Sequence, residues 1–488
     1  MNKPIRAMSI FCMVLFMALL MNTTYLQYLK ADDLNSRNDN KRVRDAEFSR
    51  DRGAILVGGQ SVAESVPSKD QYKYQRTYKQ PFKFAHATGY YSYIYGRDAV
   101  ELTQNDILSG SDPRFFVDRV VDMIGNSQPK GGSVSLTIDP AAQDAAYEGL
   151  AALGANVEGA VVALEPSSGK ILAMVSSPSY NPNVLSSHDF SAVQKNRERL
   201  LANPQKPMLN RGTQEIYPPG STFKLVTAAA ALESGQYQPD SLVKGGDSLD
   251  LPQTDRDLPN YATGICGTNR ITLTHALSQS CNTSFGAIGM QLGDEALREQ
   301  AEKFGFGDVY LEDLLRQAES RFPPPDVDDP LTAYSAIGQY EVAATPLQMA
   351  MVVAGIANGG TVMRPYLVDE VRAPDLSVLD KTNPEPFRDA TSSSTARDLT
   401  QMMVETVDNG TAAPAAIPGI KVAGKTGTAQ SQADRPNYAW FVSFAPADNP
   451  EVAVAVLVED AGVANDLISG GGLAAPIAKS VMEAVINQ

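Results

Sequence analysis

The chain has 488 residues, of which 43% are hydrophobic, and carries a formal net charge of −15 with a pI near 4.8. This length exceeds what one hydrophobic core usually holds, so more than one domain is expected. The acidic balance argues against nucleic acid as a partner, and three histidines without an H-E-x-x-H pattern argue against a metal hydrolase; no cofactor is indicated.

An uncharged stretch at residues 7–29 follows Lys3 and Arg6. It is long enough to cross a bilayer as a helix, and the preceding basic residues resemble the start of an export signal. Residues 21–25 offer no A-x-A-like cleavage site, which favours a retained anchor over a cleaved signal. We therefore expect a cytoplasmic tail and transmembrane anchor over 1–29, in the cell membrane. Basic residues also follow the span, so their count alone does not decide its orientation.

Residues 30–128 are expected to form a juxtamembrane connector and an N-terminal, β-rich pedestal domain. The connector is charged and poor in large apolar residues, and a strand and turn follow it at 52–59. Tyr91, Tyr93 and Tyr95 alternate, which predicts one face of a strand packed in a core; a platform for a partner or glycan is the alternative. A stretch rich in polar residues, Gly and Pro, with a short helical pattern at 115–124, marks the end of this domain.

Residues 129–488 are expected to form one larger domain. Strands are predicted at 134–139, 159–164, 171–176, 421–422, 439–444 and 452–458, the second and third as a hairpin. Helical patterns are predicted at 140–153, after Pro476, and over most of 221–358 apart from a loop at 322–330. Strands at both ends with helices between them indicate an α/β or α+β arrangement of layers around one sheet.

Ser221 begins the most informative stretch of this domain. It follows Tyr-Pro-Pro-Gly at 217–220 and precedes an alanine-rich run at 225–232, which predicts a position in the first turn of a helix. Residues three apart share one face of a helix, so the amine of Lys224 is expected within hydrogen-bond reach of the Ser221 hydroxyl. An amine that accepts the hydroxyl proton activates a serine nucleophile. Taken alone, S-x-x-K is also common at the start of buried helices.

Two later motifs make the chemistry specific. The second motif consists of Ser280, Cys281 and Asn282. The third, in a strand-like context, consists of Lys425, Thr426, Gly427 and Thr428. S-x-x-K, S-D-N and K-T-G in this order form the set used by penicillin-binding proteins and class A β-lactamases. The three motifs together are far more specific than any one of them.

With these motifs the chain resembles the monofunctional penicillin-binding proteins, and in particular the actinobacterial penicillin-binding protein A type, a class B-like D,D-transpeptidase. Supporting patterns lie at 52–55, 89–101, 136–139, 345–350 and 357–360. The resemblance implies a penicillin-recognising serine transpeptidase fold, with an antiparallel sheet between helices. It also implies a substrate, the D-Ala-D-Ala end of peptidoglycan stem peptides, and acylation by β-lactams. The pedestal is too short to hold a glycosyltransferase domain.

The chemistry of the motif residues can be argued individually. Lys224 must be neutral to accept a proton, and both burial and the nearby Lys425 charge are expected to lower its pKa. Ser280 is expected to relay a proton, and the Asn282 amide to bind the substrate backbone. Lys425 with the hydroxyls of the third motif suits the terminal carboxylate of the donor peptide. By analogy with the family, the backbone N–H groups of Ser221 and Thr428 form the oxyanion hole.

Gly427 is expected to leave room for substrate to lie against its strand. Cys281 departs from the family pattern, which has Asp at that position. If the domain is outside the membrane, Cys266 and Cys281 are a possible disulfide beside the active site; two reduced, half-buried thiols are the alternative. Cys12 lies within the span.

The expected function is therefore a peptidoglycan D,D-transpeptidase that cross-links stem peptides through a serine acyl-enzyme. Expected partners are peptidoglycan stem peptides, lipid-linked precursors, β-lactams, the cytoplasmic membrane, and glycosyltransferase, divisome or elongasome proteins. A D,D-carboxypeptidase or β-lactamase would use the same motifs with water as the acceptor. A catalytically silent division scaffold and a membrane β-lactam sensor are the alternatives from another class, although a sensor would need a larger cytoplasmic part than the residues before the span.

Overall fold

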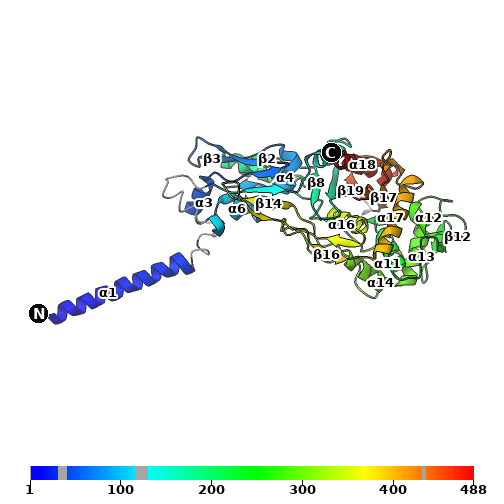
Figure 1. Ribbon diagram of the computed structural model, residues 1–488, viewed down its shortest axis with the longest axis horizontal. Coiled ribbons are helices and arrows are strands. Elements are labelled where there is room, and N and C mark those ends of the chain that lie inside the picture. The colour runs from blue at the N-terminus through cyan, green and yellow to red at the C-terminus, as the bar shows by residue number, and fades with distance from the viewer. Residues whose placement is uncertain (1, 31–33, 35–40, 116–129, 431–435, 488) are drawn as a thin grey trace.

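A long N-terminal helix projects from the rest of the molecule in the computed structural model, which describes residues 2–30, 34, 41–115, 130–430 and 436–487 (Figure 1). This helix, α1 (Asn2–Thr24), continues into a π-helical turn, η1 (Tyr25–Leu29). Over Lys3–Leu29 it is apolar and none of it is buried, and its length suffices to cross a membrane. The described part of the expected anchor is therefore helical from Asn2 to Leu29, and its apolar stretch is not buried against the rest of the described residues.

The pedestal is built around a six-stranded sheet of order β15-β14-β6-β1-β2-β3. Its strands are β1 (Ile55–Val57), β2 (Gln60–Pro67), β3 (Tyr74–Tyr78), β6 (Ser133–Leu136), β14 (Val368–Arg372) and β15 (Val378–Lys381). Strands β1 and β2 form an antiparallel hairpin across Gly58 and Gly59, both with positive φ, whereas β1 and β6 are parallel.

Three separate parts of the chain contribute to this sheet. The sequence placed β6, β14 and β15 in the domain 129–488, but they belong to the same sheet as the N-terminal strands, joined to them by the pairing of β6 with β1. The expected boundary at 128/129 and residues 116–124 of the expected helix lie outside the described residues. A single cut in the sequence therefore does not separate the two sheets of the molecule.

A buried ion-pair network lies within the pedestal. Glu101, on α5 (Ala99–Thr103), accepts hydrogen bonds from Arg52 Nε at 2.7 Å, Arg76 Nε at 2.6 Å and the Tyr78 hydroxyl at 3.0 Å. Burial alone would raise the pKa of Glu101, but the two guanidinium groups outweigh it and lower the pKa. The carboxylate thus stays ionised in the core and joins three segments of the pedestal.

The aromatic residues of the pedestal pack differently from the prediction. Only Tyr91 lies in a strand, β4 (Tyr91–Ser92), which pairs with β5 (Gly96–Arg97). Tyr93 and Tyr95 fall in the connecting turn, so the prediction of a single alternating strand is wrong. Tyr91 instead stacks on Phe48 of α3 (Lys41–Phe48), with ring centroids 4.2 Å apart. The ring stacking and the burial of Tyr91 favour core packing over an exposed platform.

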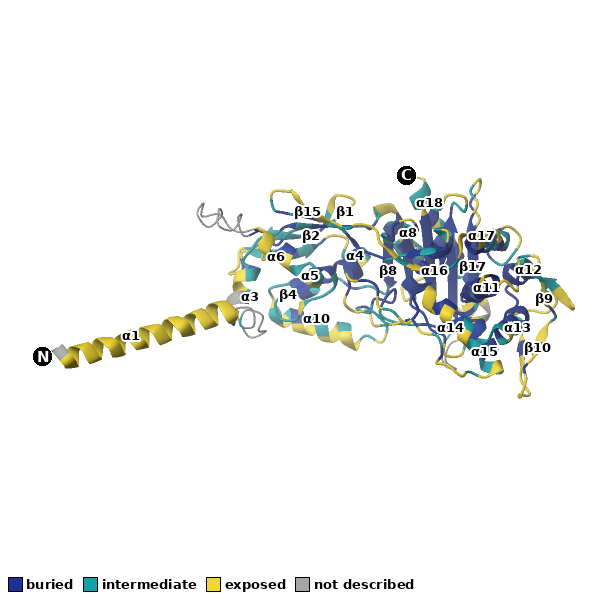
Figure 2. Ribbon diagram, turned by 60° about the horizontal axis from the view of Figure 1, so that its bottom comes forward, coloured by how far each residue is buried: buried dark blue, intermediate teal, exposed yellow. Residues whose placement is uncertain are grey.

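The larger domain contains a five-stranded antiparallel sheet of order β17-β18-β19-β7-β8. Its strands are β7 (Glu158–Leu164), β8 (Ile171–Ser177), β17 (Ala423–Ala429), β18 (Tyr438–Ala445) and β19 (Val452–Asp460). Alternate residues face two hydrophobic cores, so the central strands are buried on both sides (Figure 2). This confirms the expected antiparallel sheet between helices and the predicted hairpin of β7 and β8.

Helices cover both faces of this sheet. One core contains α8 (Pro140–Ala151) and α18 (Ala475–Ile486); the other contains α11 (Lys224–Glu233) and α16 (Pro346–Ala357). Side chains cap several of them, since Asp139 accepts a hydrogen bond from Ala142 N and Thr345 one from Gln348 N. The other helices of six or more residues are α4 (Pro81–Thr88), α10 (Phe190–Ala202), α12 (Leu273–Ser278), α13 (Asn282–Leu292), α14 (Asp294–Lys303), α15 (Asp329–Ala336) and α17 (Ser393–Asp408).

Residues 242–272 depart from the helical prediction. They form four short strands, β9 (Leu242–Lys244), β10 (Ser248–Asp250), β11 (Asp257–Pro259) and β12 (Arg270–Thr272), paired as β9-β12 and β10-β11. Glycines at 245, 246, 264 and 267 and prolines at 252 and 259 interrupt any helix here. This small β-rich part packs on α13, next to the second motif. Another short pair, β13 (Thr361–Met363) and β16 (Pro386–Asp389), follows α16.

Candidate functional site

Ser221 lies in a short 3₁₀ helix, η3 (Gly220–Thr222), one residue before α11 begins. This agrees with the prediction that Ser221 stands at the start of a helix. The preceding Gly220 has φ +53°, and an added Cβ would lie 3.0 Å from Ala429 Cβ and 3.1 Å from Thr428 O. Only glycine fits this left-handed turn against strand β17. Gly220 N also donates to Gly338 O at 2.9 Å, which fixes the turn from its other side.

Lys224 is fully buried at the start of α11. Its Nζ donates to the carbonyl oxygen of Ser280 and to Oδ1 of Asn282, both at 2.7 Å, and lies 3.3 Å from Ser280 Oγ. The expected bond to the Ser221 hydroxyl is not among the hydrogen bonds of the described residues. Lys224 is instead held by the second motif.

The pKa of Lys224 is well below its ordinary value. Burial is the larger cause, and the positive charge of Lys425 is the second. A neutral amine has two N–H groups, and two short hydrogen bonds to oxygen acceptors use both of them. The nitrogen lone pair is then left to accept a proton, which is the property that a general base needs.

Ser280 lies between the two lysines. Its Oγ accepts a hydrogen bond from Lys425 Nζ at 2.8 Å, while Lys224 approaches from the other side. Ser280 has φ +59°, a strained conformation for a residue with a side chain. Asn282 begins α13, and its Nδ2 donates to Pro259 O at 2.8 Å. The amide expected to bind substrate thus also holds the wall formed by β11.

Cys266 and Cys281 form a disulfide with their Cα atoms 5.9 Å apart. Both cysteines are fully buried. Of the two alternatives that the sequence leaves open, the structure contains the bond. It joins the loop between β11 and β12 to the middle residue of the second motif, next to the hydrogen bond from Asn282 to Pro259. Residues 257–266 are therefore fastened twice to the start of α13.

Lys425 lies in β17, where the third motif pairs with β18. It is fully buried, which lowers its pKa to about 7, and its Nζ donates to Ser280 Oγ and to Thr426 O. The Thr426 hydroxyl hydrogen-bonds that of Thr411 at 2.6 Å. Lys425 is thus a titratable cation close to neutral pH.

The side of Gly427 on which a Cβ would stand faces other protein atoms, whereas the sequence led us to expect substrate there. An added Cβ would lie 2.9 Å from Thr222 Cγ2, 3.0 Å from Pro219 O and 3.0 Å from Trp440 Cβ. The space above Gly427 is therefore taken by the segment that carries Ser221. Glycine at this position lets the first and third motifs come into direct contact.

A cavity of about 870 Å³ opens over the three motifs. Ser221, Ser280, Asn282, Thr426 and Thr428 line it. Sequence reasoning missed the rest of the lining, which consists of Leu258, Pro259, Asn260, Tyr261, Leu331, Tyr334, Ile337, Gln339, Tyr340, Thr411, Gln430, Asn437, Ile468, Ser469, Gly470 and Gly471. These residues lie on separate loops and helices that only the tertiary fold brings together. The exposed rings of Tyr261 and Tyr340 give the cavity an aromatic rim.

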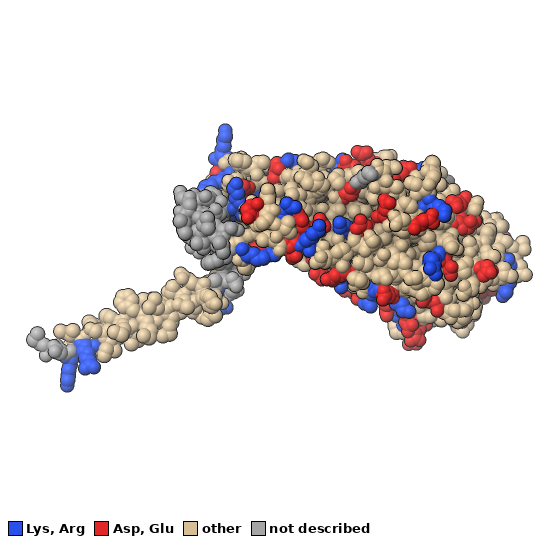
Figure 3. Space-filling view, viewed as in Figure 1, with Lys and Arg blue, Asp and Glu red and all other residues tan. Residues whose placement is uncertain are grey.

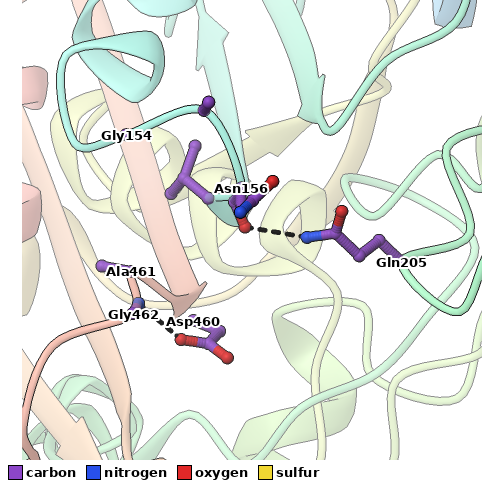
Figure 4. Close-up of a pocket in the computed structure, with 8 residues that line it drawn as sticks. Gly154, Asn156, Gln205, Asp460, Ala461 and Gly462 are labelled. Carbon is purple, nitrogen blue, oxygen red and sulfur yellow. Dashed lines mark hydrogen bonds between the residues drawn. The ribbon is translucent and has the colours of Figure 1, made fainter.

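A shallower hollow of about 260 Å³ lies away from the motifs (Figure 4). In it, Gln205 Nε2 donates to Asn156 O at 2.9 Å and Gly462 N donates to Asp460 Oδ1 at 2.7 Å. Within the described part of the chain, no three or more histidine, cysteine, aspartate or glutamate side chains are grouped to hold a metal ion. Residues of all three motifs line the cavity over Ser221 and not this smaller hollow.

Charges of both signs are interspersed over the face of the body seen in Figure 3. Helix α1 shows basic side chains near its N-terminal end, where Lys3 and Arg6 lie, and is otherwise uncharged along the visible face. This pattern suits a helix that spans a membrane.

Comparison with known proteins gives consistent results over nearly the whole chain. The penicillin binding protein transpeptidase domain model matches residues 159–483, and the penicillin binding protein A dimerisation domain model matches 52–134. The peptidoglycan D,D-transpeptidase PbpA of Mycolicibacterium smegmatis is 42% identical over 495 residues, covering 100% of both chains. The protein of the same name from Mycobacterium tuberculosis is 42% identical over 492 residues, covering 100% of this chain and 99% of that one.

Solved structures agree with these matches. The ceftriaxone acyl-enzyme complex of penicillin-binding protein A from M. tuberculosis superposes with a TM-score of 0.84 at 40% identity, covering 91% of this chain and 100% of that one. A D,D-transpeptidase domain from Eggerthella lenta gives a TM-score of 0.75 at 32% identity, covering 90% of this chain and 99% of that one.

Proposed function

We propose that Ser221 is the nucleophile and Lys224 the general base of this chain, which belongs to the penicillin-binding protein family. Its activity is that of a peptidoglycan D,D-transpeptidase. The observation that carries the assignment is the pair of short hydrogen bonds that occupy both N–H groups of a buried Lys224. The third contact of the amine, 3.3 Å to Ser280 Oγ, is then the one in which its lone pair can accept a hydrogen bond, and Ser221, three residues before Lys224, lines the large cavity. We assign this chemistry to a catalytic domain within 129–488, of which strands β6, β14 and β15 complete the sheet of a pedestal that residues 30–128 begin.

Acylation begins when Ser221 Oγ attacks the carbonyl carbon between the two terminal D-alanines. The hydroxyl proton passes to Lys224, the C–N bond breaks, and a proton carried through Ser280 reaches the departing amine of D-alanine. An ester between Ser221 and the shortened stem peptide remains. The amine of a second stem peptide then attacks this ester and loses a proton to Lys224. The bond between the acyl carbon and Ser221 Oγ breaks, Oγ takes up that proton, and a new amide and the free Ser221 hydroxyl result.

Substrate recognition is assigned to the third motif and the oxyanion hole. The Lys425 ammonium and the hydroxyls of Thr426 and Thr428 suit the terminal carboxylate of the donor peptide. The backbone N–H groups of Ser221 and Thr428 would stabilise the negative oxygen of the tetrahedral intermediate. Loss of one such donor typically costs about 2.7 to 4 kcal/mol of transition-state stabilisation.

We also propose that the catalytic domain lies outside the cytoplasmic membrane, with helix α1 crossing it once. The buried disulfide supports this orientation, because such bonds persist in oxidising compartments. Lipid-linked precursors and a glycosyltransferase of the division or elongation machinery would then be its partners. Protease added to intact spheroplasts should digest the body; protection of the body there would reverse the assigned orientation.

The test of function uses purified full-length protein in detergent. A stem pentapeptide ending in D-Ala-D-Ala serves as donor and a second stem peptide with a free side-chain amine as acceptor. The wild type should release D-alanine and form the cross-linked product, and Ser221→Ala should do neither. Ser234→Ala, at the far end of the same helix, is the matched control and should behave as wild type. Release of D-alanine without cross-linking would indicate a carboxypeptidase, and no reaction by either protein would indicate a scaffold.

A further inference from the structure

We propose that Trp440 is a positioning residue that sets the spacing between the two halves of the oxyanion hole, an inference that rests on the function proposed above. The two N–H groups assigned to this hole, those of Ser221 and Thr428, come from segments far apart in the sequence. Catalysis by such a hole depends on both donors being held where the negative oxygen will form. Some part of the fold must therefore fix one segment relative to the other.

Trp440 contacts both segments at once. It lies in the middle of β18, is fully buried, and pairs with Gly427 in the ladder to β17, one residue before Thr428. Its indole Nε1 donates to the carbonyl oxygen of Pro218 at 2.9 Å, three residues before Ser221. One side chain and its own backbone thus connect the first motif to the third.

The atoms around Gly427 are packed so closely that the first and third motifs have little room to move relative to each other. The Cβ that Gly427 lacks would lie equally close, at 3.0 Å, to Trp440 Cβ and to Pro219 O. On a third side, the Cβ that Gly470 lacks would lie 2.0 Å from Trp440 O, so the glycine-rich segment that lines the cavity also rests on this residue. Trp440 is therefore where the first motif, the third motif and the 469–471 wall meet.

The hydrogen bond from Trp440 is the polar part of this contact. Prolines 218 and 219 have no N–H, so these two residues can be held only through their carbonyl oxygens, whereas Gly220 N donates to Gly338 O. Pro219 O accepts from the Thr222 hydroxyl within the same segment, whereas Pro218 O accepts from Trp440 on the neighbouring strand. Without the indole N–H, the partly buried carbonyl of Pro218 would lack that partner and the segment could shift away from β18. Misplacement of a catalytic group by about 1 Å can cost about a hundredfold in rate.

Because Trp440 is the only tryptophan of the chain, the hydrogen bond can be removed by changing one atom. Expression in a tryptophan auxotroph supplied with benzothienylalanine replaces the indole N–H by sulfur and keeps the shape of the ring. The full-length protein is then reacted with benzylpenicillin, and the acylation rate constant and the dissociation constant of the non-covalent complex are measured separately. We expect the acylation rate constant to fall about tenfold and the dissociation constant to stay within about twofold.

The control for general damage to the strand is Phe441→Leu. Phe441 is the next residue of β18, also fully buried, but faces the opposite core with α8 and α18. This variant should lose thermal stability while keeping an acylation rate constant close to wild type. In the unsubstituted protein, acylation of Ser221 should shift the fluorescence emission of Trp440, because its indole contacts the segment that carries Ser221.

An acylation rate constant within twofold of wild type in the sulfur-substituted protein would overturn the inference. So would an equal loss of rate in Phe441→Leu, because the effect would then follow strand stability. Failure of the proposed function is distinguishable, since the unsubstituted protein would itself form no adduct on Ser221.

Discussion

The two lysines that contact the Ser280 hydroxyl differ in their electrostatic surroundings, which is the basis for the different roles proposed for them. Lys224 is buried beside a second cation, so its pKa falls further than burial alone would bring it, and its amine donates to two carbonyl oxygens. Lys425 has a pKa of about 7 and can still carry a charge when substrate arrives. One lysine is suited to accept a proton and the other to bind a carboxylate.

Replacing Lys224 with arginine should abolish acylation while preserving the fold. Arginine keeps its charge at all working pH values and has no lone pair to accept the Ser221 proton. We expect the acylation rate constant for benzylpenicillin to fall by at least about a hundredfold, the lower range for loss of a general base. Stopped-flow or quenched intact-mass kinetics would measure it. Substantial activity in Lys224→Arg would show that another group accepts the proton.

The titration of Lys425 predicts a falling alkaline limb in the pH profile. Its pKa is lowered to about 7, so its ammonium is present below that pH and lost above it. Capture of a carboxylate-bearing substrate by the free enzyme should therefore decline as pH rises through about 7. In Lys425→Arg the charge persists and this limb should disappear, even if the overall rate is lower. An unchanged limb in that variant would assign the titration to another group.

At the scale of elements, the sequence predicted well the parts governed by local rules. Pro-Pro-Gly before an alanine-rich run placed Ser221 at the start of a helix, and turn residues at 166–169 placed the hairpin of β7 and β8. Residues 242–272 were missed because their strands are only three residues long and each buries about one side chain, which gives no periodic signal. The cavity lining they supply could not be predicted for the same reason.

The disulfide ties this missed region to the second motif, and its loss should affect both stability and catalysis. A double variant, Cys266→Ser with Cys281→Ser, should lower the free energy of unfolding by about 2 to 4 kcal/mol, the usual range for a native disulfide. It should also slow acylation, since Ser280 and Asn282 flank Cys281. Denaturation followed by Trp440 fluorescence, together with penicillin kinetics, would measure both. Cys12→Ser, in the span, is the matched control. Unaltered stability and kinetics would show that the crosslink is dispensable.

At the scale of the whole molecule, the pedestal and the catalytic domain share their chain. Strands β14 and β15 follow catalytic-domain helices in the sequence but belong to the pedestal sheet. No local pattern in the sequence predicts this arrangement. The pairing of β14 with β6 depends on residues more than two hundred positions apart. We therefore expect the two parts to unfold together.

Glu101 provides the test of this coupling. Glu101→Gln leaves Arg52 and Arg76 buried without their carboxylate, and removing one partner of a buried ion pair costs about 3 to 5 kcal/mol. Trp440, in the other sheet, should report the loss as an earlier fluorescence transition. Because the folded pKa of Glu101 is lowered, its contribution is complete above its unfolded pKa, roughly 4.3, and is lost as pH falls through the folded value.

Glu64→Gln, which affects only the surface pair of Glu64 with Lys79, should change stability by less than about 1 kcal/mol and serves as the control. A pedestal transition in Glu101→Gln, seen by circular dichroism, that leaves the Trp440 transition unmoved would contradict the coupling.

The most direct test of the account as a whole is intact-mass spectrometry of the full-length protein incubated with benzylpenicillin and followed over time, with peptide mapping of the adduct. The account predicts one penicillin per chain, attached at Ser221, that persists long after free drug is removed, and no adduct on Ser221→Ala. An adduct on another residue, or a brief adduct with continuous hydrolysis of the drug, would contradict it.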